Sequence, residues 1–304
     1  MKKKIIISIV ILIATILSTI AYCVAEQYKM AVACLFLGIL IESLINSLFG
    51  KLKALLLSRY GWKRDLKKLI KDHTLTEKDY IRISFAYLYR ICVDGKYLLV
   101  LNGRNINKYQ PVGGAYKCHK IEKEVLTGMD FRVCDDNFIK IDQTSMDDYR
   151  MRVPAINLIK FVKRFNKSQD RENLNNLSRE FKEELINTKI LKKQIFKQIK
   201  YRYCGRHYTE VRYSNYNNCY ELLLADIVEL MPDDKQLNCL RDMQSKVSDK
   251  YIWATEDEIK SRGIIPGTNN MQEKITDHSQ KILTSLSSEL HIKKKDQKIY
   301  TINL

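Results

Sequence analysis

The sequence predicts a mixed α/β domain preceded by a hairpin of two membrane-spanning helices. Two apolar runs, the uncharged residues 5–25 and residues 30–49 with Glu42 as their one charged side chain, each match a hydrocarbon core of about 30 Å. Strand-like stretches rich in β-branched and aromatic residues begin at residue 81. An acidic amphipathic helix is predicted later, over residues 177–185. Together these features favour a membrane anchor followed by a folded domain.

The link between the two apolar runs, residues 26–29, is so short that the runs must form a helical hairpin. A cleaved signal peptide is the alternative, because Lys2–Lys4 and the small residues near Ala25 also fit that pattern. Basic residues flank the outer ends of both runs, which predicts that both termini are cytoplasmic. We therefore expect residues 1–50 to form a multi-pass membrane anchor with the main domain in the cytoplasm.

The second run carries a polar row, with Gly38, Glu42, Asn46 and Gly50 at four-residue steps. Glu42 costs on the order of 3 kcal/mol within a span, so it should face protein or water. The row could be packing between the two spans of one chain, or it could be an oligomer contact or pore lining. Both interpretations stay open, and we expect a homo-oligomer.

Residues 51–72 form a basic, partly amphipathic linker that we expect to continue as a helix along the membrane surface. Tyr60 and Trp62 suit an interfacial aromatic belt. The main domain is predicted to span residues 73–290, and residues 291–304 to form a polar, Lys-rich tail.

The main domain is expected to begin with a hairpin, in which Asp94-Gly95 connects strands over 81–93 and 97–101. In the stretch 108–117, Gly113 and Gly114 permit a bulge or a close backbone approach to a ligand. Short strands are expected at 131–134 and 138–141. Pro154 starts a helical stretch over 156–165, and a buried strand covers 221–230.

Three carboxylates share one side of the acidic helix, Glu180, Glu183 and Glu184, while Arg179 lies four residues before Glu183. Oxygen ligands on a rigid helix suit Mg²⁺, which is the one cofactor that the sequence suggests. The alternative is an ordinary solvated acidic helix face. These three residues are therefore metal ligands only if this helix belongs to an active site.

A basic, tyrosine-rich stretch over 192–220 points to an anionic partner. In the strand-like segment 200–203, Lys200 and Arg202 would share one face and Tyr201 and Tyr203 the other. Arginine recognises phosphate and aromatic rings stack on bases. The alternative is a half-buried sheet with a solvated basic face. His207 and His278 could be ligands, although such histidines are more often structural.

The net charge and the cysteine spacing indicate the kind of ligand and the compartment of the main domain. The formal charge of +17 favours a phosphate-bearing ligand or anionic lipid. The eight cysteines are scattered without zinc spacing, which predicts a reduced, cytosolic main domain. No Ser-His-Asp or Cys-His arrangement is supported, so the catalytic residues are unknown.

Three pieces, in order, resemble the Nudix family: QPVGGAYK at 110–117, REFKEEL at 179–185 and YIWATEDEIKSRGI at 251–264. REFKEEL is similar to the centre of the Nudix box, Arg-Glu-apolar-x-Glu-Glu. The chain departs from the box where Ile186 replaces a glycine and where Arg171 stands for the upstream glutamate, with Glu172 one place off. The segment between the Gly-Gly pair and the helix is longer than in a plain Nudix hydrolase.

With two N-terminal spans, this combination resembles the SMODS-associated Nudix domain of bacterial CBASS antiphage systems. The resemblance implies a mixed sheet between helices and an effector that binds a cyclic oligonucleotide, assembles its spans and disrupts the membrane. The alternatives are a membrane-tethered, Mg²⁺-dependent Nudix hydrolase of nucleoside diphosphate derivatives and an anchored interaction module without a small ligand. Because the box is degenerate, we expect catalysis to be absent or vestigial.

We expect the cyclic oligonucleotide to contact cations, stacking rings and the glycine turn, and we expect no DNA or RNA partner. The candidate residues are Gly113, Gly114, Arg202, Tyr203, Arg206, His207 and Tyr213.

Overall fold

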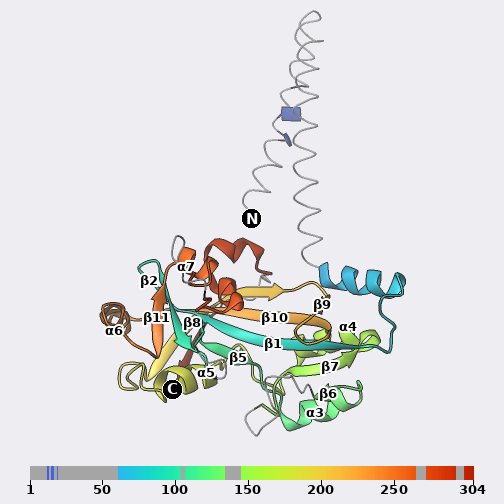
Figure 1. Ribbon diagram of the computed structural model, residues 1–304, viewed down its shortest axis with the longest axis horizontal. Helices are drawn as coiled ribbons and strands as arrows, with labels where there is room; N and C mark the ends of the chain where they lie inside the picture. The colour runs from blue at the N-terminus through green and yellow to red at the C-terminus, as the bar shows by residue number, and fades with distance from the viewer. Residues whose placement is uncertain are drawn as a thin grey trace, which may run out of the picture. The chain divides into compact units, whose positions relative to one another are not determined.

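The first predicted strand becomes β1 (Tyr80–Arg90), which lies at the centre of the domain in the computed structural model (Figure 1). Every second side chain of this strand is fully buried: Ile81, Ile83, Phe85, Tyr87 and Tyr89. These side chains face one side of the sheet, as a period of two requires. One face of β1 therefore lines the main hydrophobic core.

The structure describes residues 12–13, 15–16, 19, 61–103, 107–133, 145–264, 272–291 and 298–304. The chain divides into two units, Met1–Gly61 and Trp62–Leu304, and the second holds the elements discussed below. The predicted spans and the polar row of the second run fall outside the described residues, except for five positions in the first run. No helix in the described part of the chain is long and apolar enough to cross a membrane.

The main sheet has eight strands in the order β12-β8-β10-β1-β7-β6, with β5 beside β1 and β9 beside β10. β1 runs parallel to β10 and antiparallel to β5 and β7, so the expected mixed sheet is confirmed. The strands joining β1 are β5 (Gly113–Ala115), β6 (Arg132–Val133), β7 (Arg150–Pro154), β8 (Gln198–Tyr208), β9 (Arg212–Ser214), β10 (Cys219–Leu230) and β12 (Ile299–Asn303).

A second, four-stranded sheet has the order β11-β3-β2, with β4 beside β3. Its strands are β2 (Cys92–Val93), β3 (Lys96–Leu101), β4 (Tyr109–Gln110) and β11 (Tyr251–Ala254). The predicted hairpin turn is confirmed, since Asp94 and Gly95 have φ angles of 49° and 78° between β2 and β3. Two consecutive positive φ angles match the type I′ turn that joins twisted strands.

Helices cover both faces of the main sheet. On the face of Phe85, α4 (Ala155–Lys167) begins directly after Pro154, and its Phe165 ring meets Phe85 edge-on at 4.6 Å. On the opposite face, Leu88 and Ile227 pack with residues of the 3₁₀ helix η2 (Asp277–Ile282). The remaining helices are α3 (Lys120–Thr127), α5 (Arg179–Phe181), η1 (Lys182–Ile186), α6 (Asp234–Gln244), α7 (Glu256–Lys260) and η3 (Ser285–Glu289). The expected mixed sheet between helices is therefore present.

Two expectations about the ends of the domain are wrong. Trp62 is only 5% exposed and stacks on Tyr208 at 6.3 Å, so it lies in the domain core and not in a membrane belt. Residues 299–303 are not tail but strand β12, whose Ile302 is buried against β8. In both cases an apolar side chain within a basic segment packs into the hydrophobic core, and the composition of the segment alone does not predict that burial.

Candidate functional site

The acidic helix forms, but in an unusual way, because α5 continues directly into η1, a π-helix. Leu177, Phe181 and Leu185 are all fully buried, which confirms the predicted apolar stripe. The wider π turn changes where side chains three and four residues apart point. The three glutamates of this helix consequently do not share one environment.

The glycine strand β5 meets two of these glutamates. The amide of Gly113 donates a 2.9 Å hydrogen bond to Glu184 Oε2, and Gln110 Nε2 donates to the other oxygen at 3.3 Å. A Cβ at Gly113 would overlap the carbonyl oxygen of Tyr87, and one at Gly114 would overlap the carboxylate of Glu180. Gly113 thus permits the close approach of β5 to β1, and Gly114 permits that of the acidic helix to β5.

Arg179 clamps the same region from the helix side. Its guanidinium lies 2.5 Å from Glu180 Oε1 and 3.1 Å from Glu172 Oε2, and it donates to the carbonyl of Ala115 at 2.8 Å. Glu172 also accepts from Tyr87 Oη at 3.1 Å. The sequence pattern placed Glu172 one position off the box. The fold nevertheless brings its carboxylate to Arg179, as only the tertiary contact could reveal.

Burial governs the electrostatics of this cluster. Desolvation, followed by the charge of Glu180, raises the pKa of Glu184 to about 8. Desolvation also raises the pKa of Glu180, although Arg179 opposes that rise. The raised pKa favours the protonated form of Glu184 at neutral pH, while the Gly113 and Gln110 hydrogen bonds act in the opposite direction.

The carboxylates do not fit a Mg²⁺ site. Both oxygens of Glu184 accept hydrogen bonds, from Gly113 and Gln110, and Arg179 pairs with Glu180 Oε1. The Glu183 side chain is 54% exposed and lies 3.6 Å from Arg179. Among the residues that the structure describes, no three His, Cys, Asp or Glu side chains are grouped to hold a metal ion. The arrangement is an internal clasp between the helix and β5.

The pairing of the basic strand β8 with β10 contains a register shift: Ile227 of β10 pairs with Gly205, but the next residue, Val228, pairs with Tyr203. Because of this bulge, Tyr203 and Arg206 reach the same fully buried carboxylate, Asp226. Arg206 makes two hydrogen bonds to Asp226, of 2.6 and 2.7 Å, and Tyr116 Oη donates to it at 2.7 Å. Strict alternation would have separated Tyr203 from Arg206.

The other predicted ligand residues lie apart from this network. Arg202 is 49% exposed and pairs with Glu229, so the shared outer face of Lys200 and Arg202 is confirmed. His207 contacts the Lys281 carbonyl at 2.9 Å, and burial lowers its pKa. Tyr213 is 48% exposed and meets the Tyr220 ring at 5.3 Å. In the described structure, Gly113 and Gly114 meet glutamates and not these residues.

A family model covers most of the folded domain. The profile of the SMODS-associated NUDIX domain matches residues 80–283. The chain belongs to this family. The family is associated with SMODS (CBASS) nucleotide-signalling systems. A search of curated proteins found no relative that matches this chain.

The matched NUDIX region begins at the first residue of β1 and ends just after η2. The helix over residues 62–71 and strand β12 therefore lie beyond the match, although both pack on the domain core. These two segments are additions to the matched region in this chain.

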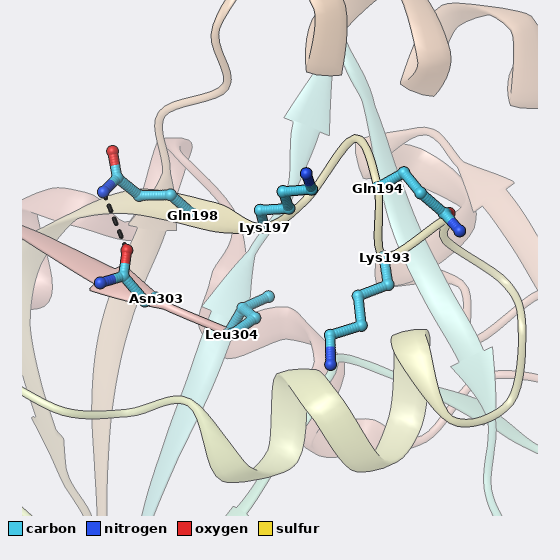
Figure 2. A pocket seen from close by; sticks show the side chains of 6 residues that line it. All are labelled: Lys193, Gln194, Lys197, Gln198, Asn303 and Leu304. Atoms are coloured by element: carbon cyan, nitrogen blue, oxygen red, sulfur yellow. Dashed lines mark hydrogen bonds between the residues drawn. The ribbon is translucent and has the colours of Figure 1, made fainter.

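An open cavity of about 660 Å³ lies where β12 meets the start of β8 (Figure 2). Figure 2 shows that its lining comes from the segment before β8, from β8 itself and from the chain end, where Gln198 donates to Asn303 at 3.0 Å. The lining residues are Lys193, Gln194, Lys197, Gln198, Asn303 and Leu304. Two lysines give the cavity a basic character, but the box residues take no part in it.

Proposed function

We propose that this protein is a membrane-anchored effector of a CBASS antiphage system. Its NUDIX domain binds a cyclic oligonucleotide second messenger, and binding drives assembly of the N-terminal spans and disruption of the inner membrane. Family membership and the two apolar runs, residues 5–25 and 30–49, support this proposal.

The geometry of the box is the observation that favours a sensor over a hydrolase. Metal-assisted hydrolysis needs several carboxylates that are available to hold a cation and activate water. Here Glu184 accepts a hydrogen bond from the Gly113 amide, and Glu180 forms an ion pair with Arg179. The box therefore acts as a structural clasp, and the domain works by binding.

The helix over residues 62–71 offers a physical route from the domain towards the predicted spans. Trp62 stacks on Tyr208, and the Tyr208 hydroxyl accepts from Arg206 at 3.4 Å. A ligand shifts an equilibrium only by its differential affinity for the two states. A ligand that alters the packing of β8 would therefore change how Trp62 packs against Tyr208.

For the membrane-spanning part, the proposal specifies a topology and a contact between copies of the chain. Both termini lie in the cytoplasm, as the flanking basic residues favour, and Gly38, Glu42 and Asn46 of the second run meet a neighbouring copy. Reporter fusions at Leu304 test the topology, and a periplasmic report would overturn it. Crosslinking in vesicles tests the contact: Glu42→Leu with Asn46→Leu should alter ligand-dependent clustering and dye leakage.

The deciding experiment is binding of a panel of cyclic di- and trinucleotides to the purified full-length protein in detergent, with Mg²⁺ present and with product analysis of the same samples. We expect saturable binding of at least one cyclic nucleotide without turnover. Turnover that is lost in Glu183→Gln or Glu184→Gln would instead establish the Mg²⁺-dependent hydrolase.

A further inference from the structure

Strand register places a row of arginines across the main sheet. Arg132 of β6 pairs with Arg152 of β7, which pairs with Arg82 of β1. The row continues through Glu221 of β10 to Arg212 of β9. Directly paired residues project to the same face, and neighbouring strands lie about 4.8 Å apart. One line across five strands thus carries four arginines and one glutamate.

The charges of this row are not balanced within it. Arg82 pairs with Glu221 at 3.3 Å, and that glutamate also accepts from Asn217 at 3.1 Å. Within the described residues, Arg152 and Arg212 have no carboxylate partner. Like charges placed opposite one another in a sheet are destabilising. The row therefore carries a local excess of positive charge.

More cations border the row. Arg150 lies two residues before Arg152, hence on the same face, and donates to Asp148 at 2.9 Å. Lys281 of η2 stands beside the other end: burial lowers its pKa, and the charge of Arg212 lowers it further, while Asp277 and Glu221 oppose this. Tyr216, 62% exposed, lies in the turn that follows β9. Because Arg82 and Arg150 are each only 8% exposed, the accessible basic side chains of this region are Arg132, Arg152 and Arg212, with an aromatic side chain near one end.

This surface is separate from the Nudix box. The box helix packs on the face of β1 that carries Tyr87 and Tyr89, since the ring of Phe181 meets that of Tyr89 at 5.4 Å. Arg82 has the opposite parity along β1 and projects to the other face. A ligand on the row would leave the Glu180 and Glu184 contacts undisturbed.

We propose that Arg132, Arg152 and Arg212, the exposed and half-buried arginines of this row, bind the phosphodiester groups of a small oligonucleotide, while Arg82 stays paired with Glu221 between them. The inference rests on the proposed function, since it assigns a site to the cyclic oligonucleotide. Guanidinium groups form bidentate hydrogen bonds with phosphate, and several of them at strand spacing suit several phosphates of one ligand. Tyr216 offers a ring for base stacking. The site lies on the opposite face of the sheet from the Arg206–Asp226 network.

The test uses purified full-length protein, a panel of cyclic di- and trinucleotides and a linear dinucleotide with 5′-phosphate as a second probe. Arg152→Gln and Arg212→Gln remove the two arginines without a described carboxylate partner. Arg241→Gln is the matched control, because Arg241 is an exposed α6 arginine that pairs with Asp94 at 2.9 Å. We expect each row variant to weaken binding about tenfold or more and to lower the salt dependence, while the control binds as the parent does.

The outcomes separate the two proposals. If the parent binds a cyclic nucleotide and both row variants bind it equally well, the row is not the site, although the proposed function stands. If the parent binds only the linear probe, and binding depends on the row, the row stands and the proposed function fails. Binding of neither probe overturns both.

A lipid arm tests another source of phosphate. If the row variants lose binding to vesicles that contain phosphatidylglycerol but keep parental nucleotide affinity, the row is a membrane contact and the inference is overturned. Thermal unfolding of each variant shows that the fold is intact, and equal weakening in Arg241→Gln would reduce the effect to general electrostatics, which also overturns the inference.

Discussion

The two faces of the main sheet treat charge in opposite ways. On the face that carries Phe85 and Tyr87, Arg206 and Asp226 are buried together, and Tyr116 and Tyr203 complete the hydrogen bonds of the carboxylate. On the other face, arginines of neighbouring strands stand side by side with Glu221 as the one carboxylate in the row. The same residue type is thus buried with several partners on one face, while on the other face Arg152 and Arg212 have no carboxylate partner among the described residues.

The difference teaches how to sort arginines by role. A buried charge with several partners cannot leave them for a ligand without a large loss of stability. A cation placed among other cations gains from the arrival of an anion. Arg206, predicted from the sequence as a ligand residue, belongs to the first kind by its contacts, and Arg152 belongs to the second.

The largest expected effect breaks the buried network. Arg206→Ala leaves the Asp226 carboxylate buried without its cation, so the free energy of unfolding should fall by about 3–5 kcal/mol. Urea unfolding of the purified protein measures this, with Arg241→Ala, an exposed arginine, expected within about 0.5 kcal/mol of the parent. A stable Arg206→Ala protein that has lost nucleotide affinity would return Arg206 to the ligand site.

The next effect concerns the clasp between β5 and the box helix. Gly113→Ala places a Cβ against the Tyr87 carbonyl at a φ of 148°, which should cost about 1–3 kcal/mol. Gly103→Ala is the matched control, because a Cβ there meets nothing within 4 Å. Equal unfolding midpoints for the two variants would show that the close approach of β5 is not required.

A smaller effect depends on pH. A carboxyl whose folded pKa is raised keeps its proton longer in the folded state, so stability is lost as pH rises from the unfolded pKa towards about 8. Glu184→Gln removes that loss and should stabilise the ligand-free protein by about 1–2 kcal/mol at pH 8, with no gain at pH 4. Unfolding at both pH values measures it, beside the exposed Glu183→Gln. Destabilisation by Glu184→Gln at pH 8 would mean that the ionised carboxylate is the favoured form.

The smallest effect is on the arginine row. Arg152→Gln relieves repulsion from Arg82 and Arg132, so it should raise the free energy of unfolding by about 0.2–1 kcal/mol without ligand. Added salt should shrink the gain, because exposed charges are screened. A clear loss of stability in low salt would place Arg152 among the structural arginines, like Arg206.

Local patterns in the sequence were sufficient for several elements. Enrichment in β-branched and aromatic residues predicted β1, the stretch 221–230 was predicted as the buried strand that β10 forms, and Asp94-Gly95 predicted the turn between β2 and β3. The apolar stripe of the box helix was also correct. These features depend on periodicity and on backbone preferences of single residues, which a sequence carries directly.

Other features depended on contacts between distant segments. The bulge that brings Tyr203 and Arg206 to Asp226, the burial of Trp62, and the reach of Glu172 to Arg179 have no local pattern. The arginine row arises from the pairing register of five strands that come from residues 82–221. Register is set by which strands meet and where, so only the tertiary structure decided which charges became neighbours.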